Sequence, residues 1–205
     1  MLKQAKIAVL VSGGGTNLQA LIDAVREGII HSGKITAVIS NNPGVFALQR
    51  AEKAGIPTAV VNKKECRDNL EFEDKLIEIL DGEGIDLIVL AGFMCILSER
   101  FTSHYKDRII NVHPSLIPSF CGEGFYGLRV HEAALSYGVK VSGATVHFVN
   151  EIPDGGRIIM QKAVEVRTGD TPEILQRRIM EEAEWKILPA SCELVCSDII
   201  KNSRK

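Results

Sequence analysis

Short apolar runs alternate, along the first half of the chain, with longer segments in which apolar residues recur every three or four positions. The short runs are typical of buried parallel strands and the longer segments of amphipathic helices. We expect strands at 7–11, 35–40, 58–61, 86–92 and from Arg108 to the proline at 114, and helices at 18–25, 45–54, 70–80 and 99–105. Because strands and helices alternate, the sequence predicts a doubly wound, mostly parallel α/β sheet of the Rossmann-like kind.

The second half departs from this alternation. Segments 140–149 and 158–166 have the pattern of strands, and the residues between them include the turn sequence Pro153-Asp154-Gly155-Gly156 but no helix. We therefore expect an antiparallel strand pair near the C-terminus. Further helices are expected at 130–137 and from 171 to 187, and Pro189 should interrupt the latter before a last helix.

The charge composition of the chain indicates which kind of partner it binds. The 205 residues carry 24 Lys and Arg against 26 Asp and Glu, a net charge of -2. This balance gives no basic surface for nucleic acid or an anionic membrane, so a small-molecule partner is expected. The N-terminal residues show no cleavable leader, and no apolar run is long enough to span a bilayer, so we expect a soluble, cytoplasmic protein.

The five cysteines form no CxxC pair, which suits reduced thiols in a cytosolic protein. Cys192 and Cys196 are four residues apart on an expected helix and are within reach of a shared metal ion. Two buried helix residues are the preferred interpretation, and no metal is expected.

Two polar side chains interrupt the apolar run that precedes Pro114. Asn111 and His113 are two residues apart, so on a strand they lie on one face, about 6.6 Å from each other. Pro114 lacks an N–H and suits the end of a strand, which would bring the pair to a sheet edge. An amide can donate to a developing oxyanion, and an imidazole can do the same or move a proton. The alternative is a pair of structural residues.

A glycine loop follows the first expected strand, in Ser12-Gly13-Gly14-Gly15-Thr16-Asn17. Its backbone N–H groups and the helix behind it suit a phosphate. The pattern is not G-x-G-x-x-G, which disfavours a dinucleotide, and a tight strand-to-helix turn with a capping side chain remains the alternative.

Two further residues and two further segments are candidates for the site. Asp154 is either a turn residue or the carboxylate that supports the histidine, whereas His147 is interpreted as structural or as a support behind the site. The apolar run 93–97 is either core or the wall of a ligand pocket. The segment 119–127 is either a mobile loop beside the site or a plain surface connection.

Several of these motifs occur together in one known family. Asn111-x-His113-Pro114-Ser115, the glycine loop, Ala91-Gly92-Phe93-Met94, Thr145-Val146-His147-Phe148-Val149 and Asp154-Gly155-Gly156 resemble the phosphoribosylglycinamide formyltransferases, folate-dependent enzymes of purine synthesis. The Asn-x-His-Pro-Ser block alone marks the wider formyl-folate family. The length of 205 residues disfavours its methionyl-tRNA formyltransferases and formyltetrahydrofolate deformylases, which carry additional modules.

The resemblance implies a role for each matching residue. Asn111, His113 and Asp154 would be catalytic, and glycinamide ribonucleotide would bind Gly15, Thr16, Asn17 and Glu184. The folate cosubstrate, 10-formyltetrahydrofolate, would contact Met94, Cys95, Ile96, Leu97, Asn111, Asn150, Glu151, Ile152 and Pro153.

The resemblance also implies how the chain is organised. Residues 1–205 would form one formyltransferase domain, with phosphate binding in 1–100 and catalysis and folate binding in 101–205, as a monomer or homodimer.

A hydrolase that releases formate from the same folate would share the catalytic residues. A nonenzymatic nucleotide-binding domain would use only the glycine loop.

Overall fold

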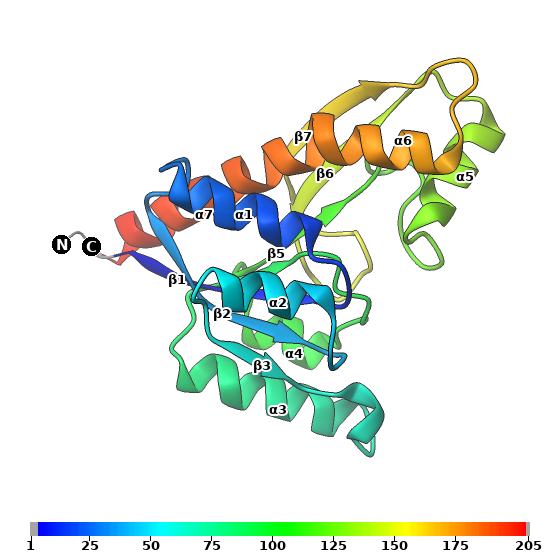
Figure 1. Cartoon of the computed structure of the whole chain (residues 1–205). Helices are drawn as coiled ribbons and strands as arrows, with labels where there is room; N and C mark the ends of the chain where they lie inside the picture. Colours follow the sequence, from blue (N-terminus) through cyan, green and yellow to red (C-terminus); the bar gives the residue numbers. More distant parts are fainter. Residues whose placement is uncertain (1–3, 204–205) are drawn as a thin grey trace.

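A seven-stranded sheet forms the centre of the computed structural model, which describes residues 4–203 (Figure 1). The strands are β1 (Ala5–Val11), β2 (Gly33–Ser40), β3 (Thr58–Val60), β4 (Leu87–Leu90), β5 (Ile109–His113), β6 (Val141–Phe148) and β7 (Ile158–Glu165). Their order in the sheet is β3-β2-β1-β4-β5-β6-β7. The first five strands pair in parallel, while β6 is antiparallel to both β5 and β7. The predicted doubly wound sheet with an antiparallel C-terminal pair is confirmed.

Helices cover both faces of the sheet. They are α1 (Thr16–Arg26), α2 (Phe46–Lys53), α3 (Asn69–Gly82), α4 (Glu99–His104), α5 (Leu128–Tyr137), α6 (Pro172–Ile179) and α7 (Trp185–Asn202), with short turns η1 (Lys63–Glu65) and η2 (Met180–Glu184). Alternate residues of β1 enter different cores: Val9 packs with α1, α2 and α7, and Leu10 packs with α3 and α4. Buried on both faces, β1 is apolar from Ile7 to Val11, as the sequence pattern indicated.

The prediction for Pro189 was wrong. Pro189 lies inside α7, which continues to Asn202, and the irregular segment is instead the π-helical turn η2 just before it. Proline removes one backbone hydrogen bond and costs about 3 kcal/mol in a helix interior. Burial of an apolar face of α7 that includes Leu188, Cys192 and Cys196 outweighs this cost. Both cysteines are buried with free thiols, as preferred.

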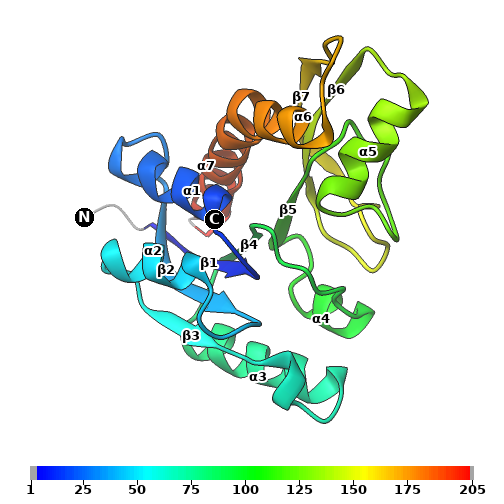
Figure 2. The ribbon, with the colours of Figure 1, turned by 45° about the vertical axis from the view of Figure 1, so that its right-hand side comes forward.

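The strand order reverses between β1 and β4, and sheets of this kind form a crevice at such a reversal. The chain runs outward from β1 to β2 and β3, then returns to place β4 and β5 on the other side of β1. Ligands of such sheets bind at the carboxyl ends of the strands beside this reversal. Figure 2 shows β2, β3 and α3 on one side of β1, and β6, β7 and α5 on the other.

No helix within residues 4–203 is long and apolar enough to cross a membrane. Residues 1–3 lie outside the described residues. The expected absence of a cleavable leader depends partly on these residues.

Candidate functional site

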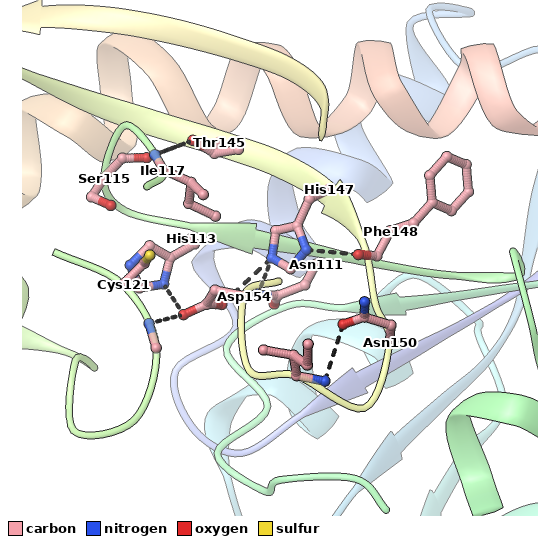
Figure 3. Close-up of polar contacts among 12 residues, drawn as sticks. Asn111, His113, Ser115, Ile117, Cys121, Thr145, His147, Phe148, Asn150 and Asp154 are labelled. Atoms are coloured by element: carbon pink, nitrogen blue, oxygen red, sulfur yellow. Dashed lines mark hydrogen bonds and ion pairs between the residues drawn. The ribbon is translucent and has the colours of Figure 1, made fainter. Parts of the chain in front are cut away.

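The pairing of β5 with β6 brings two polar side chains together at the crevice. Asn111 is opposite His147 in the antiparallel register, and the Asn111 Nδ2 donates to His147 Nε2 at 3.2 Å. The expectation that Asn111 and His113 share a face agrees with their contacts, because Asn111 contacts His147 and His113 contacts Asp154 in one cluster (Figure 3). His147 was interpreted as structural or supporting, and it lies within this cluster.

Asp154 lies between the two imidazoles, although it is 41 residues beyond His113 in the chain. Its Oδ2 is 3.4 Å from His113 Nδ1, and its Oδ1 is 3.5 Å from His147 Nε2 (Figure 3). The Gly122 N–H donates to Oδ2 at 2.9 Å. One carboxylate thus contacts three donors or potential donors, which fixes its orientation.

Backbone carbonyls determine the tautomers of both histidines. His113 Nε2 is 2.9 Å from the carbonyl oxygen of Phe120, and His147 Nδ1 is 2.8 Å from that of Phe148. Because a carbonyl only accepts, each of these nitrogens carries a hydrogen. Protonation of His113 therefore places its second N–H on Nδ1, facing Asp154.

The charges in this cluster oppose the effect of burial. Burial lowers the pKa of His113 below its ordinary value, and the Asp154 charge and the Phe120 carbonyl resist that shift. Burial by itself would raise the pKa of Asp154, but the contact with the His147 ring, the His113 charge and the Gly122 N–H outweigh it and lower that pKa. The site thus keeps an ionised carboxylate beside a histidine able to change protonation.

The loop between β6 and β7 carries Asp154 to this position. Its tight turn includes an Asn150 side chain that accepts the Ile152 N–H at 3.1 Å. Asp154 itself has a positive φ of 56°, which Asp tolerates better than most residues. At Gly156 a β-carbon would lie 1.7 Å from the Phe148 carbonyl oxygen, so only glycine allows this approach. Asp154 is therefore a turn residue and a member of the cluster at once.

The segment 119–127 lies beside this cluster. It supplies the Phe120 carbonyl that accepts from His113 and the Gly122 N–H that donates to Asp154. This position agrees with a loop beside the candidate site, and the mobility of the loop stays a prediction.

The glycine loop lies at the N-terminus of α1, at the carboxyl end of β1. Gly15 takes the left-handed conformation with φ 71°, and within the described residues no side chain caps α1 there. Its first-turn N–H groups are therefore available to an anion. The Ser/Thr/Asn cap of the alternative interpretation is absent from this helix, which favours the ligand-binding interpretation.

Asn17 and Glu184 meet beside that loop from 167 positions apart. The Asn17 Nδ2 donates to Glu184 Oε2 at 2.7 Å, while Asn17 Oδ1 is buried without a partner among residues 4–203. Burial raises the pKa of Glu184 to about 7, and the Asn17 hydrogen bond only partly opposes this rise. The π turn η2 holds Glu184 in place, and Thr16 lies close to the same turn, with its Oγ1 3.8 Å from Met180 Sδ.

The run 93–97 is divided between core and surface. Phe93 and Leu97 are buried, whereas Met94 and Ile96 are 59% and 65% exposed. Cys95 is half-buried and accepts from the Asn41 side chain at 3.1 Å. The core interpretation is thus wrong for the two exposed residues, which follow β4 beside β5 and offer an apolar wall.

The structure therefore groups the predicted residues in two places along the carboxyl edge. Asn111, His113 and Asp154 form the polar cluster, and Asn17 with Glu184 forms the second group at the glycine loop. His147 is a member that sequence reasoning undervalued. Within residues 4–203, no three His, Cys, Asp or Glu side chains gather as metal ligands would.

Fold and site together define a class: a doubly wound α/β protein with acid–base groups at the carboxyl edge of its sheet and an open glycine loop beside them. The family model described as formyl transferase matches residues 5–191. The chain belongs to the formyl transferase family.

Named relatives and solved structures agree with this assignment. The human trifunctional purine biosynthetic protein adenosine-3 is 47% identical over 97% of this chain, which spans only 19% of that relative's length. The phosphoribosylglycinamide formyltransferase of Haemophilus influenzae is 44% identical over 90% of this chain and 84% of its own. The crystal structure of glycinamide ribonucleotide transformylase 1 from Symbiobacterium toebii superposes with a TM-score of 0.89 at 41% identity, covering 95% of this chain and 89% of that one.

Proposed function

We propose that the chain transfers the formyl group of 10-formyltetrahydrofolate to the amine of glycinamide ribonucleotide, a step of purine biosynthesis. The observation that carries this proposal is the position of Asp154 between His113 and His147, with the Asn111 amide alongside. Amide and imidazole donors suit a tetrahedral oxyanion, and a carboxylate beside an imidazole suits proton transfer. The names of the relatives support the choice of substrates.

In this reaction the substrate amine attacks the formyl carbon of the folate. The carbonyl oxygen becomes an oxyanion, to which Asn111 and protonated His113 donate. The intermediate then breaks its bond to N10 of the folate, which takes up a proton as the substrate nitrogen loses one. Asp154 stabilises the charge of His113 during these proton transfers and orders water for them.

The Phe120 carbonyl competes with the oxyanion for the Nε2–H of His113 in this reaction. It accepts the Nε2–H of His113, and the other ring nitrogen faces Asp154. For Nε2–H to reach the oxyanion, the substrate oxygen must replace the Phe120 carbonyl as acceptor. The segment 119–127 therefore shifts when the folate binds.

Glycinamide ribonucleotide binds at the glycine loop in this proposal. Its phosphate accepts from N–H groups of Gly15, Thr16 and Asn17 at the start of α1, where the helix carries partial positive charge. Glu184, buried beside Asn17, accepts from the ribonucleotide. The unpartnered Asn17 Oδ1 supports a polar ligand at this position.

The folate lies against the other side of the cluster. Met94, Ile96 and Ile152 are more than half exposed. Exposed apolar side chains of this kind suit the wall of a site for an apolar ring system. The backbone of Cys95 and Leu97 offers hydrogen bonds to the pterin. Across the ring, the remaining proposed contacts are Asn111 and the hairpin-loop residues Asn150, Glu151 and Pro153.

The proposal extends to the whole chain. Residues 1–205 act as one domain in which 1–100 supply the phosphate site and 101–205 supply catalysis and the rest of the folate site. The partners are the two small molecules, with no metal and no nucleic acid, and the chain acts as a monomer or homodimer. The five free thiols support a reducing, cytoplasmic location.

One incubation tests this function against hydrolysis of the folate. Purified protein is mixed with 10-formyltetrahydrofolate, with and without glycinamide ribonucleotide, and tetrahydrofolate and formate are both measured. We expect tetrahydrofolate to form only when the ribonucleotide is present, with the formyl group on its amine. Release of formate at the same rate without the ribonucleotide would instead identify a hydrolase, and no turnover in either mixture would favour a nonenzymatic nucleotide-binding domain.

A further inference from the structure

Arg50 of α2 lies against the glycine loop, far from the polar cluster in sequence. Its Nε donates to the carbonyl oxygen of Gly14 at 2.9 Å. A β-carbon on Gly15 would lie 3.4 Å from Arg50 Cδ and 2.7 Å from the β-carbon of Ala47. The loop is therefore packed directly on α2, and Gly15 is required both for its positive φ and for this close approach.

Contacts with α2 determine which way the peptide groups of the loop face. The Gly13 carbonyl accepts from the Ala47 N–H at 3.1 Å, and the Gly14 carbonyl accepts from Arg50. In a trans peptide the N–H points opposite to the C=O. The N–H groups of Gly14 and Gly15 therefore point away from α2, toward the side where an anion would bind.

The guanidinium of Arg50 is held in place by uncharged groups. Its Nη1 donates to Gln19 Oε1 at 3.1 Å, and its central carbon lies 4.7 Å from the centre of the Phe46 ring. Both hydrogen-bond acceptors, the Gly14 carbonyl and the Gln19 amide, are neutral. Arg50 thus brings a half-buried positive charge to the loop without a carboxylate at these contacts to cancel it.

We infer that Arg50 is a positioning residue for the phosphate of the substrate. By holding the Gly14 carbonyl toward α2 it keeps the adjacent N–H groups directed at the phosphate, and its charge adds to that of the α1 N-terminus. Arg50 acts through the loop and makes no contact with the phosphate itself. This inference rests on the proposed function, since it takes glycinamide ribonucleotide as the ligand.

Arg50→Gln tests the inference, because glutamine removes the charge and cannot reproduce the contact geometry. Two substrates are compared, glycinamide ribonucleotide and glycinamide riboside, which lacks the phosphate. We expect the KM for the ribonucleotide to rise about tenfold or more with kcat within about twofold, as for a lost ground-state interaction. The KM for 10-formyltetrahydrofolate and the kcat/KM for the riboside should both stay unchanged.

Arg26→Gln is the matched control, because it removes the same charge from the exposed C-terminal end of α1. It should leave all of these constants unchanged. An unchanged KM in Arg50→Gln would overturn the inference, and so would an equal loss for ribonucleotide and riboside, because Arg50 would then support the fold without acting on the phosphate. If the unsubstituted protein does not formylate the ribonucleotide at all, the proposed function itself fails, which is a separate outcome.

Discussion

At the scale of single residues, the chemistry depends on one carboxylate placed between two imidazoles. Burial alone would favour the neutral forms of both Asp154 and His113. The charge of each residue favours the charged form of the other and so opposes this effect. The Phe120 carbonyl fixes which nitrogen of His113 carries the hydrogen in the neutral ring. Burial still keeps the pKa of His113 below its ordinary value, and Asp154 is the neighbour that most favours the protonated histidine that the proposed reaction requires.

Asp154→Asn should lower the pKa of His113. The substitution keeps the size of the side chain but removes the negative charge that favours the imidazolium. We expect the His113 pKa, followed by NMR titration of the ring proton, to fall below its value in the unsubstituted protein. Turnover near neutral pH should fall by about 10² to 10⁴, the usual range for a lost general acid–base group.

Asp81→Asn is the control for this prediction. Asp81 Oδ2 lies 3.0 Å from His104 Nε2, so it forms a comparable carboxylate–imidazole pair away from the crevice. Its loss should leave turnover unchanged. A His113 pKa that does not move in Asp154→Asn would show that the carboxylate does not support the charge.

At the scale of elements, a serine connects the two proposed binding loops. Ser12, which ends the strand side of the glycine loop, accepts the Met94 N–H at 2.7 Å through its Oγ. The Ser12 carbonyl also accepts from the Asn42 side chain at 3.1 Å. The loops that follow β1, β2 and β4 are thus fastened together at the carboxyl edge of the sheet.

Ser12→Ala should therefore weaken folate binding. Without the hydroxyl, the Met94 N–H loses its acceptor and the 93–97 segment loses its anchor, at a cost of about 1 kcal/mol or more. We expect the KM for 10-formyltetrahydrofolate to rise about fivefold. Ser103→Ala, on the exposed face of α4, is the control and should change nothing. Folate binding as tight as in the unsubstituted protein would show that the segment holds its shape without Ser12.

Element by element, the sequence pattern predicted most of the fold and part of the site. Period-two spacing correctly placed Asn111 and His113 on one face. It did not reveal His147, because that residue joins the cluster through the β5–β6 register, and register between distant strands is a tertiary property. Arg50 was missed for the same reason, since no local pattern indicates that α2 packs on the glycine loop.

At the scale of the whole molecule, the last helices of the chain pack on its first helix. The η2 turn and α7 pack on α1 and bring Glu184 to Asn17. The local rule for Pro189 failed here because burial of the α7 face outweighs one missing hydrogen bond. A buried carboxylic acid results, and it couples the stability of the fold to pH.

Glu184 should make the folded state less stable as pH rises from about 4.5 to about 7. Its pKa is about 7 in the folded protein against an ordinary value of 4.5, so in this range the folded state binds more protons than the unfolded state. The free energy of unfolding then decreases with rising pH, by an amount of the order of 3 kcal/mol, and is level above that range. Urea unfolding at a series of pH values measures this slope.

Glu184→Gln should remove that contribution, because the amide does not titrate. The difference in unfolding free energy between the two proteins should therefore change across this pH range and be constant on either side. A difference that is independent of pH would show that Glu184 is ionised at its ordinary pKa in the folded state.

The turnover of Asn111→Ala shows whether the polar cluster carries out formyl transfer. Asn111 donates to His147 at the crevice and would donate to the oxyanion, whereas glycinamide ribonucleotide would bind at the glycine loop through other residues. For a folded variant, verified by circular dichroism, we expect kcat for formyl transfer to fall by about 10² to 10³, the usual loss for one oxyanion donor. Calorimetry should give the same Kd for the ribonucleotide as in the unsubstituted protein. Near-normal turnover in Asn111→Ala would contradict the account.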